Sequence, residues 1–422
     1  MPDTIAAPLA FATAAAMAWL LVPLAESLAW RIGAIDRPRE RSLHLAPTPK
    51  LSGVAILIAV CAAAAIFLPW DGETRAILGG AAAIAVIGVF DDVFDLHPAL
   101  KLAGQTAAAI IPVSAGVTVD VFTLPFVGGV DPGTTRLFEL PLAGNIDLGE
   151  LGTVVGIVAM ANVVNLIDGV DGLAAGVCVI SAATLAVVAL SLERNAAGVL
   201  AAITAGGALG FLRHGFPPAS SFMGDTGSNL LGYLLAATAV QGALKTNAVV
   251  ALAFPMLVLA VPILDTGFVI AKRLKYRRPI YQADTWHFHH RMAAIGFSQR
   301  RTLAYLYGWT LVMAGVALAL RFVPYSDDRG NFDWRWSAVM ATVLIVGIAA
   351  SFYVIYVLEI LKLRRFRFRQ VAAHGPVPES EEVDRGVERE LETGHFQARN
   401  PETGEFEAVD PDTGEFEAVD TS

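Results

Sequence analysis

The sequence predicts an all-α, polytopic membrane protein with about eleven transmembrane helices. Hydrophobic residues make up 55% of the 422 residues, and the mean hydropathy is +0.57. Apolar runs near the roughly 20 residues that a helix needs to cross a bilayer recur along the chain. The expected spans cover 8–30, 51–69, 76–90, 101–117, 151–167, 171–192, 196–212, 227–244, 248–271, 302–322 and 336–358. The first run lacks a basic start and is long for a signal-peptide core, so we expect a retained span.

Basic residues indicate the side of the membrane on which each loop lies. They gather in three segments, 31–50, 272–301 and 362–369, whereas the loops of the opposite side carry only scattered cations. The positive-inside rule makes the basic segments cytoplasmic. We therefore expect a multi-pass plasma-membrane protein with its N-terminus outside and its C-terminal tail in the cytoplasm.

Two segments lie outside the expected spans: 118–150 within the membrane domain, 1–370, and the C-terminal tail, 371–422. In 118–150, Val, Phe and Leu stretches are broken by glycines and by Asp131-Pro132-Gly133, which favours a small extracytoplasmic β-hairpin. The tail, 371–422, is acidic and repeats Thr-Gly-x-Phe every ten residues. This composition is typical of a disordered segment. Repeated docking motifs for a partner protein are the alternative.

The first of four polar clusters follows the third expected span. It contains Asp91, Asp92 and Asp95, which would share one helical face if the helix continued. Lys101 and Gln105 follow within the next turns and could hold phosphate charge. Carboxylates beside the bilayer core are costly and usually functional. We interpret this cluster as a site for a metal or a phosphate, with a solvated helix end as the alternative.

The second and third clusters lie on the same side of the membrane. Asn165, Asp168 and Asp171 are spaced by three residues and alternate with glycines, and Asp225 stands between glycines at the start of a span. Amide and carboxylate oxygens are the hard ligands that Mg²⁺ prefers, and a helix N-terminus favours phosphate. Together these clusters indicate a divalent metal and a phosphate-bearing substrate.

The fourth cluster lies in a basic loop. It contains His287, His289, His290 and Arg291. Adjacent histidines on one segment rarely supply zinc geometry by themselves, so we expect these residues to contact a diphosphate or nucleotide. Zinc ligation and interfacial histidines without a catalytic role are the alternatives. Asp265 lies in the ninth expected span. It either has a functional role or only forms hydrogen bonds between neighbouring helices.

In this order, the four clusters resemble those of the polyprenyl-phosphate N-acetylhexosamine-1-phosphate transferases. The resemblance runs from about residue 34 to 307 and includes Arg41-x-x-His44-x-x-Pro47-x-Pro49 before the first cluster. The His-x-His-His pattern is similar to the branch that uses UDP-GlcNAc to initiate surface polysaccharide and teichoic-acid synthesis. One departure is Ser52-Gly53, where the family usually has Gly-Gly. A small serine should still allow close helix approach.

The resemblance implies transfer of a sugar-1-phosphate from a UDP-N-acetylhexosamine, first of all UDP-GlcNAc, to polyprenyl phosphate. The acceptor would be undecaprenyl or decaprenyl phosphate in the lipid bilayer, and UMP would leave. Phospho-MurNAc-pentapeptide transfer in peptidoglycan synthesis is the alternative within the superfamily. A secondary transporter is the alternative from another class, disfavoured because the acidic residues lie at one membrane boundary and not at the midplane. We expect no nucleic-acid partner and leave a homodimer open.

The resemblance also implies roles for individual residues. Asn165 and Asp225 would hold Mg²⁺, with Mn²⁺ as the alternative. Asp91 and Asp92 would orient or deprotonate the lipid phosphate, although a phosphate monoester with a second pKa near ~6 needs positioning more than deprotonation. Asp168 and Asp171 would line the nucleotide site, and the three histidines would lie at the diphosphate. The further substrate-binding residues would be His44, Asp95, Lys101 and Arg291.

Overall fold

The computed structural model divides the chain into two compact units, which are described separately. The first comprises Met1–Lys272 and Gln299–Gly347, and the second Arg273–Ser298 and Ile348–Ser422. The structure describes residues 3–37, 47–119, 122–124, 128–130, 136–140, 144–243, 263–264, 267, 297–324, 333–349, 351, 396–399 and 406–409. The predicted domain boundary near residue 370 stays a prediction.

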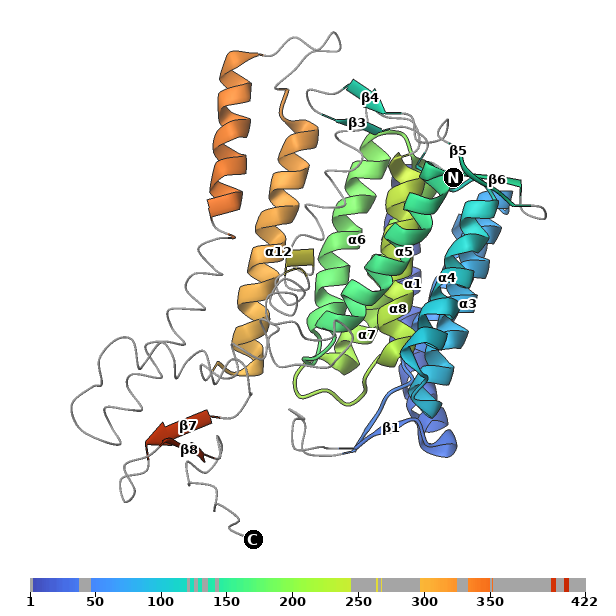
Figure 1. Cartoon of the computed structure of the whole chain (residues 1–422), viewed down its shortest axis with the longest axis vertical. Coiled ribbons are helices and arrows are strands. Elements are labelled where there is room, and N and C mark those ends of the chain that lie inside the picture. The colour runs from blue at the N-terminus through green and yellow to red at the C-terminus, as the bar shows by residue number, and fades with distance from the viewer. Residues whose placement is uncertain are drawn as a thin grey trace. The chain divides into compact units, whose positions relative to one another are not determined.

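The first unit consists mainly of helices (Figure 1). They are α1 (Asp3–Ile32), α2 (Gly53–Phe67), α3 (Gly72–Phe94), α4 (Pro98–Ser114), α5 (Leu148–Ile167), α6 (Leu173–Ser191), α7 (Asn195–Gly215), α8 (Gly224–Ala243) and α12 (Gln299–Phe322). Shorter apolar helices include Trp334–Ala349.

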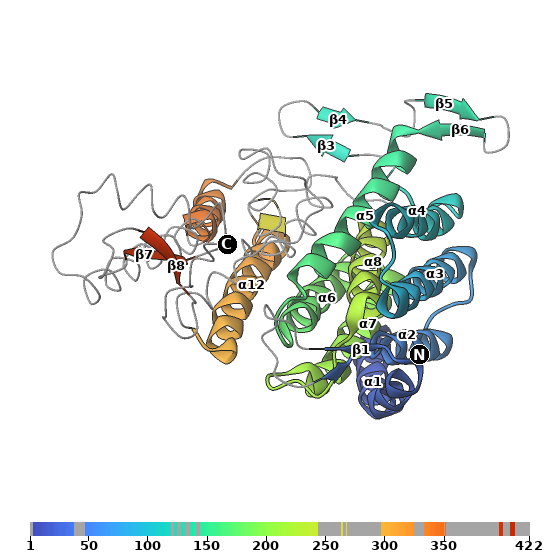
Figure 2. The ribbon, with the colours of Figure 1, turned by 60° about the horizontal axis from the view of Figure 1, so that its bottom comes forward.

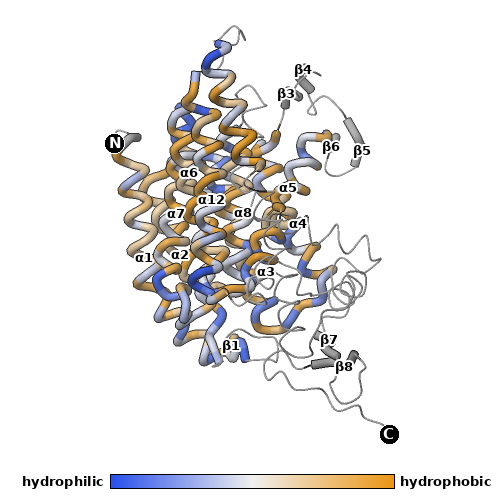
Figure 3. The backbone as a smooth tube through the Cα atoms, turned by 90° about the vertical axis from the view of Figure 1, so that its left-hand side faces the viewer, coloured by the Kyte–Doolittle hydropathy of each residue, from blue (hydrophilic) through white to orange (hydrophobic). Residues whose placement is uncertain are grey.

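Six helices within the described residues are long and apolar enough to cross a membrane, namely α1, α3, α5, α6, α7 and α12. Figure 3 shows that the middle portions of the helices are largely hydrophobic and that polar residues gather near their ends. The protein is therefore a multi-pass, mainly α-helical membrane protein. The number eleven stays a prediction, and most of the ninth expected span, 248–271, lies outside the described residues.

Helix α8 lies in the middle of the helical unit (Figure 2). It packs against α3 and α5 and also contacts α2, α6 and α7. Its residues from 226 to 238 are all buried, and they include the polar Ser228, Asn229 and Thr238. Because α8 is surrounded by other helices and not by lipid, it can carry polar side chains that would be costly on a lipid-facing helix.

Two glycines allow α2 and α3 to approach the N-terminal end of α8. A Cβ atom on Gly53 would lie 2.2 Å from the backbone nitrogen of Gly227, and one on Gly88 would lie 2.4 Å from the Cα of Thr226. The neighbouring Ser52 is fully buried, and its hydroxyl forms a 2.6 Å hydrogen bond with that of Ser221. The expectation that serine at position 52 still allows close helix approach is confirmed, and the structure adds a hydrogen bond that glycine could not make.

Short strands lie at both ends of the helical unit (Figure 1). At one end β1 (Ile35–Asp36) pairs with β2 (Thr48–Pro49). At the other end two antiparallel pairs form: β3 (Phe122–Leu124) with β4 (Gly128–Val130), and β5 (Arg136–Leu140) with β6 (Gly144–Asp147). Parts of 118–150 lie outside the described residues, and the single hairpin expected there stays a prediction.

Within the second unit, β7 (Phe396–Arg399) pairs antiparallel with β8 (Phe406–Val409). The two strands belong to consecutive ten-residue repeats, with Phe396 and Phe406 at equivalent positions. β7 alternates apolar and polar residues along its whole length, and β8 does so over its first three residues, a pattern that favours extended structure. The predicted disorder of the tail therefore does not extend to these two strands.

Candidate active site

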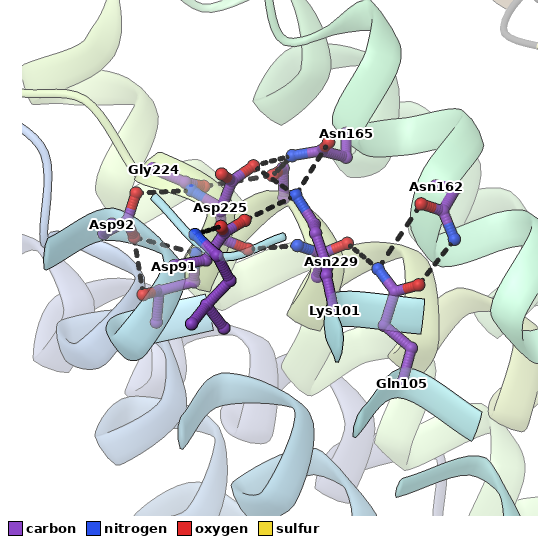
Figure 4. Close-up of polar contacts among 12 residues, drawn as sticks. Asp91, Asp92, Lys101, Gln105, Asn162, Asn165, Gly224, Asp225 and Asn229 are labelled. Carbon is purple, nitrogen blue, oxygen red and sulfur yellow. Dashed lines mark hydrogen bonds and ion pairs between the residues drawn. The ribbon is translucent and has the colours of Figure 1, made fainter. Parts of the chain in front are cut away.

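Members of the first three polar clusters meet at the N-terminal end of α8, namely Asp91, Asp92, Asn165 and Asp225 (Figure 4). The Nζ atom of Lys101 lies 2.7 Å from Asp91 Oδ2 and 3.1 Å from Asp225 Oδ1, and it donates to Asn165 Oδ1 at 3.5 Å. These residues come from α4, α3, α8 and α5 respectively. One ammonium group is therefore surrounded by two carboxylates and a carboxamide from three other helices.

A tight turn between α3 and α4 places Asp91 next to Lys101. Helix α3 ends at Phe94, and Asp95 takes the left-handed conformation with φ 53°. The backbone N–H of Leu96 donates to Asp91 Oδ1 at 2.9 Å. Pro98 starts α4 at once, where its missing N–H costs nothing. As a result, Lys101 in the first turn of α4 reaches the carboxylate in the last turn of α3.

Asp92 caps α8 from another helix. Its carboxylate accepts hydrogen bonds from the backbone N–H of Asp225 (2.9 Å) and of Thr226 (3.0 Å) and from the Thr226 hydroxyl (2.7 Å). Gly224, with φ 69°, precedes this turn, and a Cβ there would lie 2.5 Å from Asp92 Oδ2. Lys50 Nζ lies 3.9 Å from the other carboxylate oxygen. Asp92 thus stabilises the first turn of α8, as capping carboxylates do, and fixes the backbone of Asp225.

The second cluster joins this centre through Asn165. The Nδ2 group of Asn165 donates to Asp225 Oδ1 and, at 2.9 Å, to Ser228 Oγ. Asp168 follows at the C-terminal end of α5. Burial raises the pKa of the Asp168 carboxyl well above its usual range, and the negative charges of Asp225, Asp92 and Asp171 raise it further. The carboxyl groups of Asp225, Asp92 and Asp171 therefore lie close enough to Asp168 to act on it electrostatically, and such a gathering of acidic groups favours a cation at this end of the helices.

Asp171 connects the second cluster to the segment that leads into α8. Its Oδ2 atom accepts a hydrogen bond from the backbone N–H of Ala219 at 3.1 Å. Helix α12 holds both neighbouring segments: the Tyr307 hydroxyl donates to the carbonyl oxygen of Gly172 at 2.6 Å, and the Arg300 guanidinium donates to that of Pro217 at 3.1 and 3.2 Å. The start of α12 therefore lies beside the site, and in the sequence it directly follows the histidine cluster.

The structure corrects two expectations about the first cluster. Asp95 does not share a helical face with Asp91, because α3 ends before it and its backbone is left-handed; its side chain is exposed. From the sequence Gln105 could hold phosphate charge, but its side chain is only 1% exposed and is bonded to other amides. The following predicted residues lie outside the described residues, and their placement stays a prediction: His44, Asp265, His287, His289, His290 and Arg291.

Sequence reasoning missed Asn229 and the contacts of Lys50. Asn229 is 2% exposed and donates to the backbone carbonyl of Asp225 at 2.7 Å. Its position, one helical turn after Asp225 and directly before an apolar stretch, was a signal that could have found it. Lys50 stood only among the basic residues that set the orientation, because nothing in the sequence shows that β2 brings it to Asp92.

The described residues hold no group of three or more His, Cys, Asp or Glu side chains that could bind a metal. However, Asp91 Oδ2, Asp225 Oδ1 and Asn165 Oδ1 converge on one positive group, the Lys101 ammonium. Mg²⁺ in phosphate-transfer sites is commonly held by one or two carboxylates, with waters and substrate phosphates supplying the other ligands. These oxygens fit such a partial ligand set.

Comparison with known proteins finds one matching family and several relatives that are similar over most of the chain. Residues 74–243, which contain the whole charged centre from Asp91 to Asn229, match the family described as Glycosyl transferase family 4. The chain is 38% identical over 311 residues to a Bacillus subtilis protein named "Probable undecaprenyl-phosphate N-acetylglucosaminyl 1-phosphate transferase", covering 71% of this chain and 81% of the relative. It is 36% identical over 366 residues to the "Decaprenyl-phosphate N-acetylglucosaminephosphotransferase" of Mycobacterium tuberculosis (strain H37Rv), covering 80% of this chain and 86% of the relative. It is also 31% identical over 345 residues to a "Phospho-N-acetylmuramoyl-pentapeptide-transferase" of Desulforudis audaxviator, covering 76% of this chain and 98% of the relative.

Proposed function

Because the chain belongs to glycosyl transferase family 4, we propose that it transfers GlcNAc-1-phosphate from UDP-GlcNAc to a polyprenyl phosphate in the membrane. The observation that carries this proposal is the meeting of Asp91, Lys101, Asn165 and Asp225 at one end of the helices. The chain has this centre within the region that matches the family. The product, a lipid-linked sugar diphosphate, is the starting point for a surface glycan.

The chemistry requires one bond exchange. An oxygen of the polyprenyl phosphate attacks the phosphorus next to the sugar, the bond from that phosphorus to the bridging oxygen breaks, and UMP leaves with that oxygen. Positioning and charge neutralisation carry most of the catalysis in phosphoryl transfer. The acceptor phosphate is largely a dianion at pH 7, so it needs placement beside the donor more than a base.

The residues of the site divide this work. Asp225 and Asn165 would hold Mg²⁺, which neutralises the diphosphate when bound. Lys101 supplies a fixed positive charge to the phosphate oxygens, and Asp91 keeps its ammonium in place through their 2.7 Å contact. Asp92 holds the first turn of α8 and thereby the position of Asp225. The place of the histidine cluster at the diphosphate is part of the proposal and rests on its resemblance to the family pattern.

The donor sugar is tested by measuring UMP release from purified protein with polyprenyl phosphate and a set of UDP-sugars. We expect release from UDP-GlcNAc that depends on the lipid, and at least ~10-fold slower release from UDP-MurNAc-pentapeptide, a barrier difference of about 1.4 kcal/mol. A faster pentapeptide reaction would instead support the second candidate, which the 31% identity to a pentapeptide transferase keeps open. Solute movement across liposomes without any UMP release would contradict both and favour a transporter.

A nucleotide-sugar donor places the site in the cytoplasm, and cysteine labelling tests this side. The chain has two cysteines, Cys61 and Cys178, which are replaced by alanine first. The exposed Phe216 lies in the segment leading to the site, whereas Gly72, where an added Cβ would meet no atom within 4 Å, starts α3 at the opposite end. In intact cells, an impermeant thiol reagent should label Gly72→Cys and should label Phe216→Cys only after permeabilisation. The reverse pattern would place the site outside.

A further inference from the structure

A second polar layer lies one helical turn away from the charged centre, on the same three helices. Gln105 follows Lys101 by one turn on α4, Asn162 precedes Asn165 by one turn on α5, and Asn229 follows Asp225 by one turn on α8. Figure 4 shows the three side chains pointing toward one another beside the charged contacts. We call Gln105, Asn162 and Asn229 the amide layer.

Directional hydrogen bonds join the amide layer into one network. Gln105 Nε2 donates to Asn229 Oδ1 at 2.9 Å and to Asn162 Oδ1 at 3.4 Å. Asn162 Nδ2 donates to Gln105 Oε1 at 2.7 Å and to the backbone carbonyl of Val158 at 2.8 Å. Asn229 Nδ2 donates to the carbonyl oxygen of Asp225 at 2.7 Å. The network therefore crosses from α4 to α5 and α8 and ends on the backbone of a proposed metal ligand.

Stability alone does not account for a layer of this kind. Gln105 and Asn229 are 1% and 2% exposed, so they touch neither bulk water nor a substrate that enters from the helix ends. Buried amides are costly unless each is paired, and a well-packed apolar layer is often as stable or more stable. Amides add directional hydrogen bonds, and each bond forms only when its helix has one particular rotation about its axis and one particular position along that axis.

The charged centre depends on the same rotation and height. A slip of α4 by one residue turns its side chains by about 100° around the helix axis, which would carry Lys101 away from Asp91 and Asp225. Apolar side chains could slide past one another under such a slip, whereas the bonds of Gln105 to Asn162 and Asn229 would break. A slip of α4 that disrupts the charged centre therefore also breaks the hydrogen bonds of the amide layer.

We propose that the amide layer is a positioning device that fixes α4 against α5 and α8 and so sets the spacing of the oxygens that receive the metal and the phosphates. The three residues touch no reacting atom and are positioning residues. The inference rests on the proposed function, since it assumes that Asn165 and Asp225 bind the metal.

The test replaces the whole layer by apolar residues of similar size in one variant, Gln105→Met, Asn162→Leu, Asn229→Leu. Changing all three avoids leaving an unpaired amide, so the thermal midpoint in detergent should change little. Mn²⁺ binding, measured by electron paramagnetic resonance, should become at least ~10-fold weaker, and kcat for UMP release should fall by a similar factor. Gln241→Met is the matched control, because Gln241 is a buried glutamine at the far end of α8, bonded to Glu73, and it should leave both quantities unchanged.

Unchanged Mn²⁺ affinity in the triple variant would overturn the inference whatever its thermal midpoint. If that variant does not purify as a folded protein, Gln105→Met alone is compared with Gln241→Met by the same titration, and equal affinities would again overturn it. A wild-type protein that releases UMP but binds no Mn²⁺ would remove the metal assignment and this inference together while leaving the transferase function standing. A wild-type protein that binds Mn²⁺ but releases no UMP from any UDP-sugar would instead count against the proposed function.

Discussion

Replacing Asp225 by alanine is expected to lower kcat by about a thousandfold or more while the protein stays folded. The Asp225 carboxylate contacts both Lys101 and Asn165, so its loss removes a proposed metal ligand from the centre of the site. A bound metal contributes several kcal/mol of transition-state stabilisation, and about 4 kcal/mol corresponds to a factor of a thousand. Folding should survive because the substitution also removes the repulsion between the carboxylates of Asp225 and Asp91.

The measurement is UMP release at increasing Mg²⁺ or Mn²⁺, together with the thermal midpoint. In the wild-type protein, activity should vanish with EDTA and return with either ion. Asp71→Ala is a useful control, because Asp71 caps α3 at the end away from the site through a 2.8 Å bond to the Thr74 N–H. Losing that cap costs about 1 kcal/mol and should lower the thermal midpoint with little change in kcat. Substantial turnover by Asp225→Ala would remove Asp225 from the metal site.

Much of the helical architecture was predictable because the membrane imposes it. A helix must satisfy its own backbone and must be long enough to cross the hydrocarbon, so runs such as 76–90 and 151–167 lie inside α3 and α5. Helix α8 is the informative exception. Its polar residues make it less apolar than the lipid-facing helices, and its apolar run was still recognisable because glycines and Asp225 mark its start.

The members of the charged centre were also predictable, whereas their contacts were not. Asp91, Asn165 and Asp225 stood out as acidic or amide residues at helix ends. However, the cap that Asp92 provides joins residues more than 130 positions apart in the sequence, and Gln105 reaches Asn229 over a similar separation. Such bonds depend on helix rotation and packing, which hydropathy does not determine. Asp95 was misplaced for a local reason: the left-handed end of α3 gave no clear sequence signal.

Lys101→Met is expected to have opposite effects on catalysis and on metal binding. Its ammonium lies 2.7 Å from Asp91 Oδ2 and 3.1 Å from Asp225 Oδ1, where it would neutralise the charge of the transferring phosphate. Removal of one such group typically lowers kcat by about 10²–10³. The two carboxylates would then lack their positive partner, so a divalent cation should bind more tightly, because the repulsion from Lys101 is gone.

Stability gives a second readout of Lys101→Met. Without Lys101, the buried Asp91 carboxylate faces the partly exposed Asp225 carboxylate with no cation between them, which destabilises the folded state. The thermal midpoint should therefore fall in EDTA and should recover with Mg²⁺ by more than in the wild-type protein, since ligand binding stabilises the folded state. Lys101→Arg keeps the charge and should keep the wild-type midpoint in EDTA. The direction of the Mn²⁺ change separates two roles: tighter binding with slower turnover identifies Lys101 as a phosphate-neutralising group. Weaker binding, as expected for the amide-layer variants, would mean that Lys101 serves to hold the helices in place.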